Sequence, residues 1–349
     1  MRSRPWLGAC LETLTLTKLW LGLGIGASLL VVVVAIGIGS VHIPSLRVLQ
    51  IVLNPDYGTA TERAIIHTIR LPRVLMAYVA GAGLSISGVL MQSVLKNPLA
   101  STFTLGTSTG AAVGASLAIL LGVSVFGVLS VPVFGFSFAM ATVVLAIGLA
   151  SRVGGLANTA IVLVGMALTF LGGSLITILM VLNQENMQRL IFWQMGSVAG
   201  VGLGTVLVLA VVVSVGLLLG LAKHRELDIL TLDDTTASAL GLDIKRAKWY
   251  LLCLSALITG LLVSFVGIIG FVDLFTPPLA RKAVGSHVNR YVLPMAGLMG
   301  GSFLVLSDVI ARTLFAPIEL PIGAVTALIG GPLFILIYVK GGHNSHANT

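Results

Sequence analysis

Long uncharged stretches divide this chain and limit what it can fold into. The longest, residues 97–151, holds 55 residues without Asp, Glu, Lys or Arg, and a helix needs only ~20 apolar residues to cross the hydrocarbon core of a bilayer. Polar and apolar residues do not alternate in these stretches, as they would in the strands of a membrane barrel. Only 9% of the residues are charged, against about 25% in ordinary soluble domains. The sequence therefore predicts an all-α bundle of membrane helices and excludes a soluble enzyme.

The lengths of the uncharged stretches predict about ten transmembrane helices. Stretches that fit one span each are 19–41, 74–95, 153–184, 190–222, 249–272, 291–307 and 320–339. The 97–151 stretch must hold two spans, and we expect the break near Pro132. The tenth candidate, 269–281, is short and is interrupted by Pro277 and Pro278.

The distribution of Lys and Arg decides whether this tenth segment crosses the membrane, because cytoplasmic loops carry an excess of both. If it crosses and the N-terminus is cytoplasmic, 14 of these residues face the cytoplasm and 6 face outside; if it does not, the numbers are 11 and 9. Ten spans with both termini cytoplasmic is therefore the predicted topology. The first apolar run, 19–41, is longer than a signal-peptide core and no cleavage-site pattern follows it, so we expect it to remain as the first span.

Composition also limits the partners and cofactors. The formal net charge is +8, but no basic block is interleaved with aromatic residues, so lipid head groups or a protein are expected partners and nucleic acid is not. Cys10 and Cys253 are the two cysteines, and neither a disulfide framework nor a metal-ligand spacing is present. We expect no bound cofactor or metal, and residues 1–349 are predicted to form one transmembrane domain.

Arginines gather on the predicted outer side. The loop 42–73 holds Arg47, Arg63, Arg70 and Arg73, where the positive-inside bias should have removed them. One interpretation is an acidic partner on this side, because arginine binds carboxylates through two charge-assisted hydrogen bonds. The alternative is that the arginines next to the span only extend to lipid head groups.

An acid–base pair lies near the outer end of a later span. Asp308 and Arg312 are four residues apart, and Glu319 follows. This spacing is more typical of a structural ion pair than of a binding site. Arg312 nevertheless falls on the same outer side as Arg70 and Arg73, so a surface of three converging arginines is the alternative.

The cytoplasmic segment 223–248 is larger than a turn requires. Thr231 or Asp233 can cap a short helix that runs to Leu240, where Gly241 would terminate it. Its apolar positions, which are too scattered to enter lipid, are Leu232, Ala237 and Leu240. The segment is either a solvated connector or a docking surface for a cytoplasmic protein.

Several catalytic arrangements are missing from the sequence. No lysine follows a glycine, so the chain has no phosphate-binding P-loop and we expect it not to hydrolyse ATP itself. No catalytic group of residues lies within the predicted spans, which argues against an intramembrane enzyme. An ion-coupled secondary transporter of a small solute is the alternative function, and Asp273 is its one candidate intramembrane acid.

Short strings in a fixed order resemble the permease subunits of the type II ABC importers for ferric siderophores, haem and cobalamin, a FecCD-like family. The strings RLPR, GVLMQ, NPLA and LGTSTGA lie at 70–73, 88–92, 97–100 and 105–111. Further strings, FWQMGS, LGLD, GIIGFV, SDVIAR, ELPIG and ALIG, lie at 192–197, 240–243, 267–272, 307–312, 319–323 and 327–330. The resemblance therefore covers about residues 70 to 340, nearly the whole chain.

The resemblance implies a ten-span permease in the bacterial inner membrane. Such a subunit pairs with itself or with a paralogous permease, two cytoplasmic ATPase subunits supply the energy, and an external binding protein delivers the cargo. A ferric siderophore is the commonest cargo of the family, with haem or cobalamin as alternatives. In the family, acidic residues of the binding protein dock on basic positions that match Arg70, Arg73 and Arg312.

The resemblance also assigns cytoplasmic roles. The coupling helices of the family, which contact the ATPases, correspond to about residues 231–242. The positions that we assign to coupling are Leu232, Asp234, Ala237, Leu240 and Gly241. The inner gate of the family corresponds to Asn158 and Thr159. The chain departs from the family pattern at Asp273, at Pro277 and Pro278, and at His287, all within the short tenth segment and the loop after it.

Overall fold

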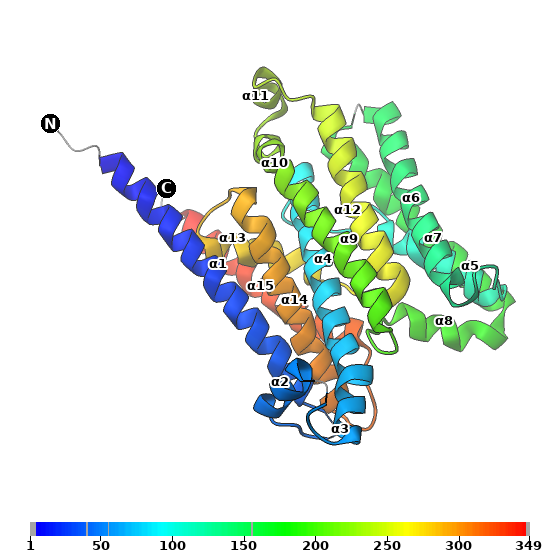
Figure 1. Cartoon of the computed structure of the whole chain (residues 1–349). Helices are drawn as coiled ribbons and strands as arrows, with labels where there is room; N and C mark the ends of the chain where they lie inside the picture. The colour runs from blue at the N-terminus through cyan, green and yellow to red at the C-terminus, as the bar shows by residue number, and fades with distance from the viewer. Residues whose placement is uncertain (1–4, 40, 55, 155, 347–349) are drawn as a thin grey trace.

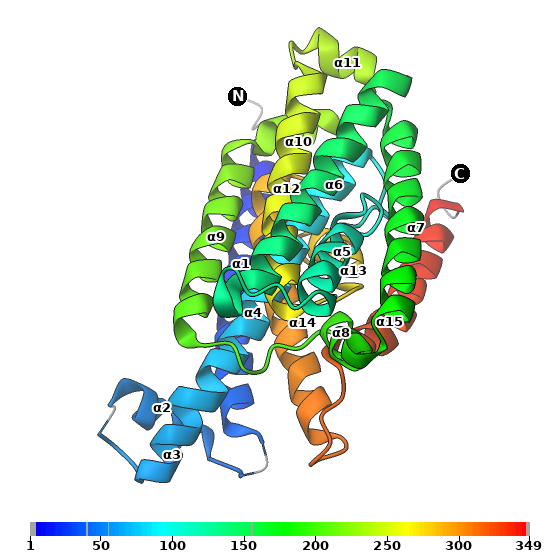
Figure 2. The same cartoon turned by 90° about the vertical axis from the view of Figure 1, so that its right-hand side faces the viewer.

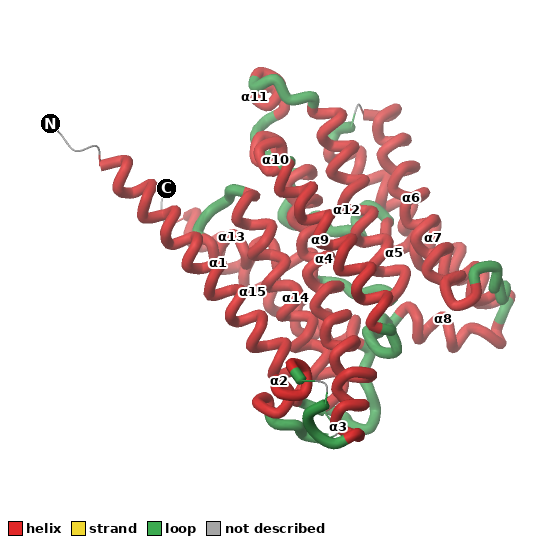
Figure 3. Tube along the Cα trace, in the orientation of Figure 1, coloured by secondary structure: helices red, strands yellow, loops and turns green. Residues whose placement is uncertain are grey.

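The computed structural model describes residues 5–39, 41–54, 56–154 and 156–346. Helices dominate this part of the chain, and it contains no strand (Figures 1 and 3). The first half comprises α1 (Pro5–Gly37), α2 (Ser45–Leu53), α3 (Ala60–Ala64), α4 (Leu71–Leu95), α5 (Thr107–Leu120), α6 (Ser130–Gly154) and α7 (Asn158–Leu182). The second half comprises α8 (Met187–Gln194), α9 (Leu203–Ala222), α10 (His224–Leu230), α11 (Asp234–Ala239), α12 (Ile244–Val266), α13 (Val272–Val284), α14 (Asn289–Thr313) and α15 (Ile322–His346).

Ten of these helices correspond to the ten predicted spans, so the all-α membrane bundle is confirmed. Within the described residues, seven are long and apolar enough to cross a bilayer: α1, α4, α6, α7, α9, α12 and α14. The apolar parts of α5 and α15 are shorter, and α13 has only 13 residues. Figure 2 shows the bundle with α2 and α3 at one end and α11 at the other.

Helix α4 forms the centre of the bundle. It packs against α9, α12, α13 and α14 and is buried along nearly its whole length. Two glycines allow this close approach: a Cβ atom on Gly81 would lie 2.2 Å from the carbonyl oxygen of Gly300, and one on Gly88 would lie 2.1 Å from that of Asp273. Small residues at such crossings bring helix backbones into contact. Helix α4 therefore connects the two ends of the bundle through a tightly packed core.

The tenth segment returns to the side from which α12 begins. The backbone N–H and the side-chain amide of Asn289, the first residue of α14, both donate to the Asp228 carboxylate of α10, at 2.9 and 2.8 Å. Because α12 also begins directly after α11, the chain must cross once within α12 and once between Gly267 and Asn289. Helix α13 alone would extend only about 20 Å. The non-helical segment between Gly267 and Val272 supplies the remaining length. Non-helical backbone at this depth is tolerated because it lies inside the protein.

Three helix boundaries differ from the predicted ones. Helix α5 ends at Leu120, so the break falls upstream of Pro132, which lies in the first turn of α6, where a missing N–H costs no hydrogen bond. The predicted outer loop is largely helical: α2 and α3 are followed by a π-helical turn, Ile65–Arg70, that continues directly into α4. Helix α1 begins at Pro5, well before the apolar run.

Candidate functional site

Arg70 is buried at the end of the bundle that holds α2 and α3. Its guanidinium donates to the carbonyl oxygens of Ile36 and Gly37, both at 3.0 Å, and to that of Val41. The residue is only 5% exposed. Carbonyls in the last turn of a helix lack intrahelical donors, and a cation there is favoured by the helix dipole. Arg70 therefore caps the end of α1 from the start of α4.

Arg73 and Arg312 share one buried carboxylate. The Arg73 Nε donates to Asp308 Oδ1 at 2.9 Å, and its Nη1 donates to Glu319 Oε1 at 2.7 Å. Arg312 lies on the other side of Asp308, with its Nε 3.5 Å from Oδ2 and its Nη2 donating to the Ala35 carbonyl at 2.7 Å. We name Arg73, Asp308, Arg312 and Glu319 the arginine cluster. The hydrogen bond from Arg73 holds the pKa of the half-exposed Glu319 below its usual range.

The arginine cluster changes how the predicted docking residues are interpreted. The structure brings Arg70, Arg73 and Arg312 to one end of the bundle, but each of them already donates to acceptors within the chain. The structural ion pair between Asp308 and Arg312 is therefore present. A carboxylate of a partner would have to displace internal acceptors to reach these three arginines. Their docking role stays a prediction.

Helix α11, at the opposite end, is built by local signals. Its N-cap is Asp233, whose carboxylate accepts from the Thr236 N–H at 2.9 Å and from the hydroxyl groups of Thr235 and Thr236. These hydrogen bonds, that from Thr235 first, hold the pKa of Asp233 far below its usual range. At the other end Gly241 has φ +82°, and the N–H groups of Gly241 and Leu242 donate to the carbonyls of Ser238 and Ala237, as in a Schellman motif. The predicted cap and terminator are both confirmed.

The predicted coupling residues divide into buried and exposed ones. Ala237 of α11 is fully buried, whereas Leu232 and Leu240 are 43% and 59% exposed. Asp234 is more than half exposed, yet its Oδ1 accepts a hydrogen bond from Lys96 Nζ at 2.5 Å. Lys96 is the residue that directly follows α4. This hydrogen bond lowers the pKa of Asp234. Leu232 and Leu240 flank the capped helix α11, and two exposed apolar side chains of this kind form a surface that a protein partner can cover.

The predicted gate residues lie at the first turn of α7, next to an unforeseen lysine. The Asn158 side-chain amide donates to the Leu95 carbonyl of α4 at 3.1 Å, and its Oδ1 accepts from Lys248 Nζ at 2.8 Å. Thr159 is exposed. Lys248 itself, in the second turn of α12, is 1% exposed. Its only sequence signal is its position directly before the apolar run 249–272.

Asp273, the one candidate intramembrane acid, is buried at the start of α13. Its Oδ2 accepts from the backbone N–H and the hydroxyl of Thr102, both at 2.8 Å. Gln92 of α4 donates to the Leu274 carbonyl at 3.0 Å and accepts from Arg281 at 2.9 Å. These bonds fasten the segment 101–106, between α4 and α5, and α13 to the centre of the bundle. Within the described residues, no group of three or more His, Cys, Asp or Glu could hold a metal ion.

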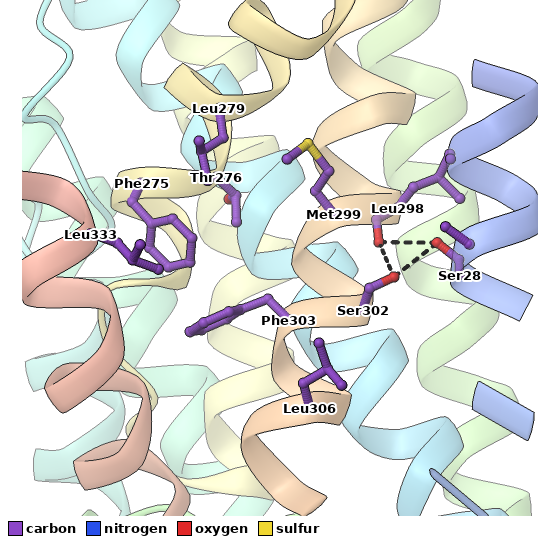
Figure 4. Close-up of a pocket in the computed structure, with 12 residues that line it drawn as sticks. Ser28, Phe275, Thr276, Leu279, Leu298, Met299, Ser302, Phe303, Leu306 and Leu333 are labelled. Atoms are coloured by element: carbon purple, nitrogen blue, oxygen red, sulfur yellow. Dashed lines mark hydrogen bonds between the residues drawn. The ribbon is translucent and has the colours of Figure 1, made fainter. Parts of the chain in front are cut away.

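A crevice of about 300 Å³ lies between α1, α13, α14 and α15. Figure 4 shows Phe275 and Phe303 on its walls, with their rings packed edge to face at 4.6 Å between centroids. The Ser28 and Ser302 hydroxyls, 2.9 Å apart, are bonded to each other or to the Leu298 carbonyl. Such walls suit a hydrocarbon chain better than a charged ligand.

Comparison with known proteins identifies the chain's relatives. Residues 27–340 match the FecCD transport family. The chain is 35% identical over 305 residues to the hemin transport system permease protein HmuU of Yersinia pestis, covering 85% of this chain and 90% of that protein. It is 37% identical over 278 residues to the cobalamin import system permease protein BtuC of Halobacterium salinarum, covering 79% and 74%.

A solved structure agrees over almost the whole chain. It is described as an inward-facing conformation of a metal-chelate type ABC transporter, with a TM-score of 0.82 and 30% sequence identity, and the match covers 93% of this chain and 99% of the other. The sequence match and the structural match therefore extend over the same bundle, from α1 to α15. The chain belongs to the FecCD transport family of ABC transporter permeases.

Proposed function

We propose that this chain is the membrane permease of an ATP-driven importer and that its cargo is an iron chelate, a ferric siderophore first and haem second, with the cobalt chelate cobalamin as a further alternative. The likeness over 93% of the chain to a metal-chelate type transporter carries the proposal. A hemin permease and a cobalamin permease among the relatives support a bulky chelate as the class of cargo. The protein would lie in the bacterial inner membrane, as a homodimer or with a paralogous permease.

In this proposal, two separate ATPase subunits bind at the end that holds α10 and α11. The support is the exposed pair Leu232 and Leu240 and the absence of a Gly-Lys pair from the sequence. This end and both termini then face the cytoplasm, and His343, whose side chain lies outside the described residues, would be shielded from reagents added outside the cell.

The external binding protein docks at the end that holds α2 and α3. Glu319 and Arg47 are the better probes of this face, because their side chains are about half exposed, whereas Arg70 is buried and the Arg312 side chain is only 7% exposed. A reversal such as Arg47→Glu should weaken docking and its salt dependence, since exposed pairs act in high dielectric and are screened. An unchanged affinity in both Arg47→Glu and Glu319→Lys would contradict docking on this face.

The function is tested by reconstituting the chain in proteoliposomes with the ATPase and binding protein from neighbouring reading frames. Uptake of a ⁵⁵Fe-labelled siderophore, of haem and of cobalamin is measured with ATP inside the liposomes and without it. ATP-dependent uptake of one chelate is the expected result. Uptake that follows an imposed proton or sodium gradient without ATP would favour the secondary transporter instead, and Asp273→Asn, which removes the buried acid, would then abolish it.

A further inference from the structure

Helix α11 is joined to three membrane helices through one group of polar residues, Lys96, Asn158, Asp234 and Lys248, which we name the lysine cluster. Asp234 Oδ1 binds Lys96 at the end of α4, and its Oδ2 lies 3.9 Å from Lys248 Nζ on α12. Lys248 in turn binds Asn158, the first residue of α7. A displacement of α11 therefore acts on two lysines that hold the inner ends of other helices.

Lys248 is unusual because its ammonium is buried with few partners. An ammonium has three donors, and two of them reach the Leu156 carbonyl at 3.1 Å and Asn158 Oδ1 at 2.8 Å. The nearest carboxylate, that of Asp234, lies within ion-pair range but beyond hydrogen-bond distance. The attraction between two opposite charges weakens as their distance grows. The position of Asp234 therefore governs how well the charge of Lys248 is compensated.

The backbone around the lysine cluster is strained. Within the described residues, three non-glycine residues have positive φ, and two of them, Lys96 at +50° and Leu156 at +67°, belong to this contact. Such conformations are rare for side chains with a Cβ and persist only where surrounding bonds hold them. Lys96 is held by Asp234, and the Leu156 carbonyl is held by Lys248. The turn that leads into α7 thus depends on Lys248, the same lysine that lies near Asp234 of α11.

We propose that Lys248 is a positioning residue: it sets the first turn of α7, and with it Asn158, according to where α11 holds Asp234. The inference rests on the proposed function, because it requires an ATPase subunit that moves α11. When α11 moves, Asp234 exchanges contact between Lys96 and Lys248, and the start of α7 follows. The signal crosses from α11 to α7 through Lys248 of α12.

The first test measures positioning in the full-length chain without any partner. Lys248→Met keeps the length of the side chain and removes its donors, and Lys245→Met is the matched control, because Lys245 is exposed on the same helix. Hydrogen exchange of backbone amides is measured over residues 156–165 in lipid nanodiscs. Lys248→Met should raise the exchange rate about tenfold, as expected for the loss of two hydrogen bonds. Lys245→Met should leave it unchanged.

The second test measures coupling in the assembled transporter, as chelate imported per ATP hydrolysed. Lys248→Met should lower this ratio about tenfold while the ATPase subunit still binds in a pull-down, whereas a merely structural lysine would lower binding and uptake together. Asp234→Asn, at an exposed position that does not threaten folding, should lower the ratio in the same direction.

Equal exchange in Lys248→Met and Lys245→Met would overturn the inference, as would an unchanged ratio in both Lys248→Met and Asp234→Asn. Should the unaltered chain show no ATP-dependent uptake at all, the proposed function fails, and the exchange rates still decide whether Lys248 holds α7.

Discussion

The arginine cluster and the lysine cluster share one arrangement in different surroundings. Each places one carboxylate between two cations on different helices: Asp308 between Arg73 and Arg312, and Asp234 between Lys96 and Lys248. The Asp308 side chain is 1% exposed, whereas that of Asp234 is 58% exposed. A buried carboxylate cannot leave its partners without losing compensation, but an exposed one can exchange a partner for water. The first cluster is suited to fastening helices together, and the second is suited to movement.

The largest expected effect comes from breaking the buried cluster. Asp308→Ala leaves two arginines buried without their carboxylate, and removing one member of a buried ion pair costs about 3–5 kcal/mol. We expect a fall of this size in the stability of the purified protein, measured by thermal unfolding in detergent. Glu319→Ala, which removes the half-exposed carboxylate of the same cluster, should cost only ~0.2–1 kcal/mol. Equal effects of the two changes would show that burial does not distinguish these carboxylates.

An intermediate effect is expected at Asn158, where the buried part of the lysine cluster begins. Asn158→Leu removes the acceptor of Lys248 and the donor to the Leu95 carbonyl. Lys248 keeps its bond to the Leu156 carbonyl, so the expected cost is that of about one unpaired buried polar group, about 1–3 kcal/mol. Thr159→Val, at the exposed neighbouring position, should stay within about ±0.5 kcal/mol. Thermal unfolding of both variants checks this, and a destabilised Thr159→Val would place the critical contacts elsewhere on the turn.

A small effect is expected at the exposed carboxylate. Asp234→Ala should cost only ~0.2–1 kcal/mol, and this cost should shrink in high salt, because the carboxylate is screened by solvent. Unfolding at low and at high ionic strength measures both. A cost as large as that of Asp308→Ala would remove the distinction between the two clusters.

The smallest expected effect is the pH dependence of the same contact. The hydrogen bond from Lys96 depresses the pKa of Asp234 in the folded state, so its stabilisation is complete above the unfolded-state pKa and is lost as the pH falls through the folded-state pKa. The difference in melting temperature between the unaltered chain and Asp234→Asn should therefore be constant near neutral pH and should narrow in acid. A difference that grows in acid would contradict the assigned sign.

Local signals account for what could be predicted from the sequence. Asp233 and Gly241 each act on backbone groups a few residues away, so the bounds of α11 follow from the order of residues alone. The uncharged stretches predict the ten helices for the same reason. The bounds of α6 were less accurate, because Pro132 is compatible with a first turn as well as with a break.

Contacts between distant segments account for what could not be predicted. Arg70 binds carbonyls 33 and 34 residues before it, so nothing near it in the sequence distinguishes a cap of α1 from an exposed docking residue. Lys248 and Asn158 are 90 residues apart. In the sequence, Lys248 resembles an ordinary lysine near a membrane surface and Asn158 is one residue of a family motif. Only the fold, which places the start of α7 beside the end of α4 and the start of α12, brings the two into contact.

The π-helical turn at Ile65–Arg70 has a consequence for how this end of the bundle can vary. A π turn holds about one residue more than an α turn, so deletion of a single residue there would restore the α-helix without breaking it. Because the extra residue is taken up within one wider turn, everything before the deletion, including α2 and α3, would keep its orientation relative to α4. The helices that bear the core would keep their register. The chain can therefore lose one residue at this turn without re-aiming the surface of α2 and α3, whereas deletion of one residue from a regular α turn would rotate the preceding segment by about 100°.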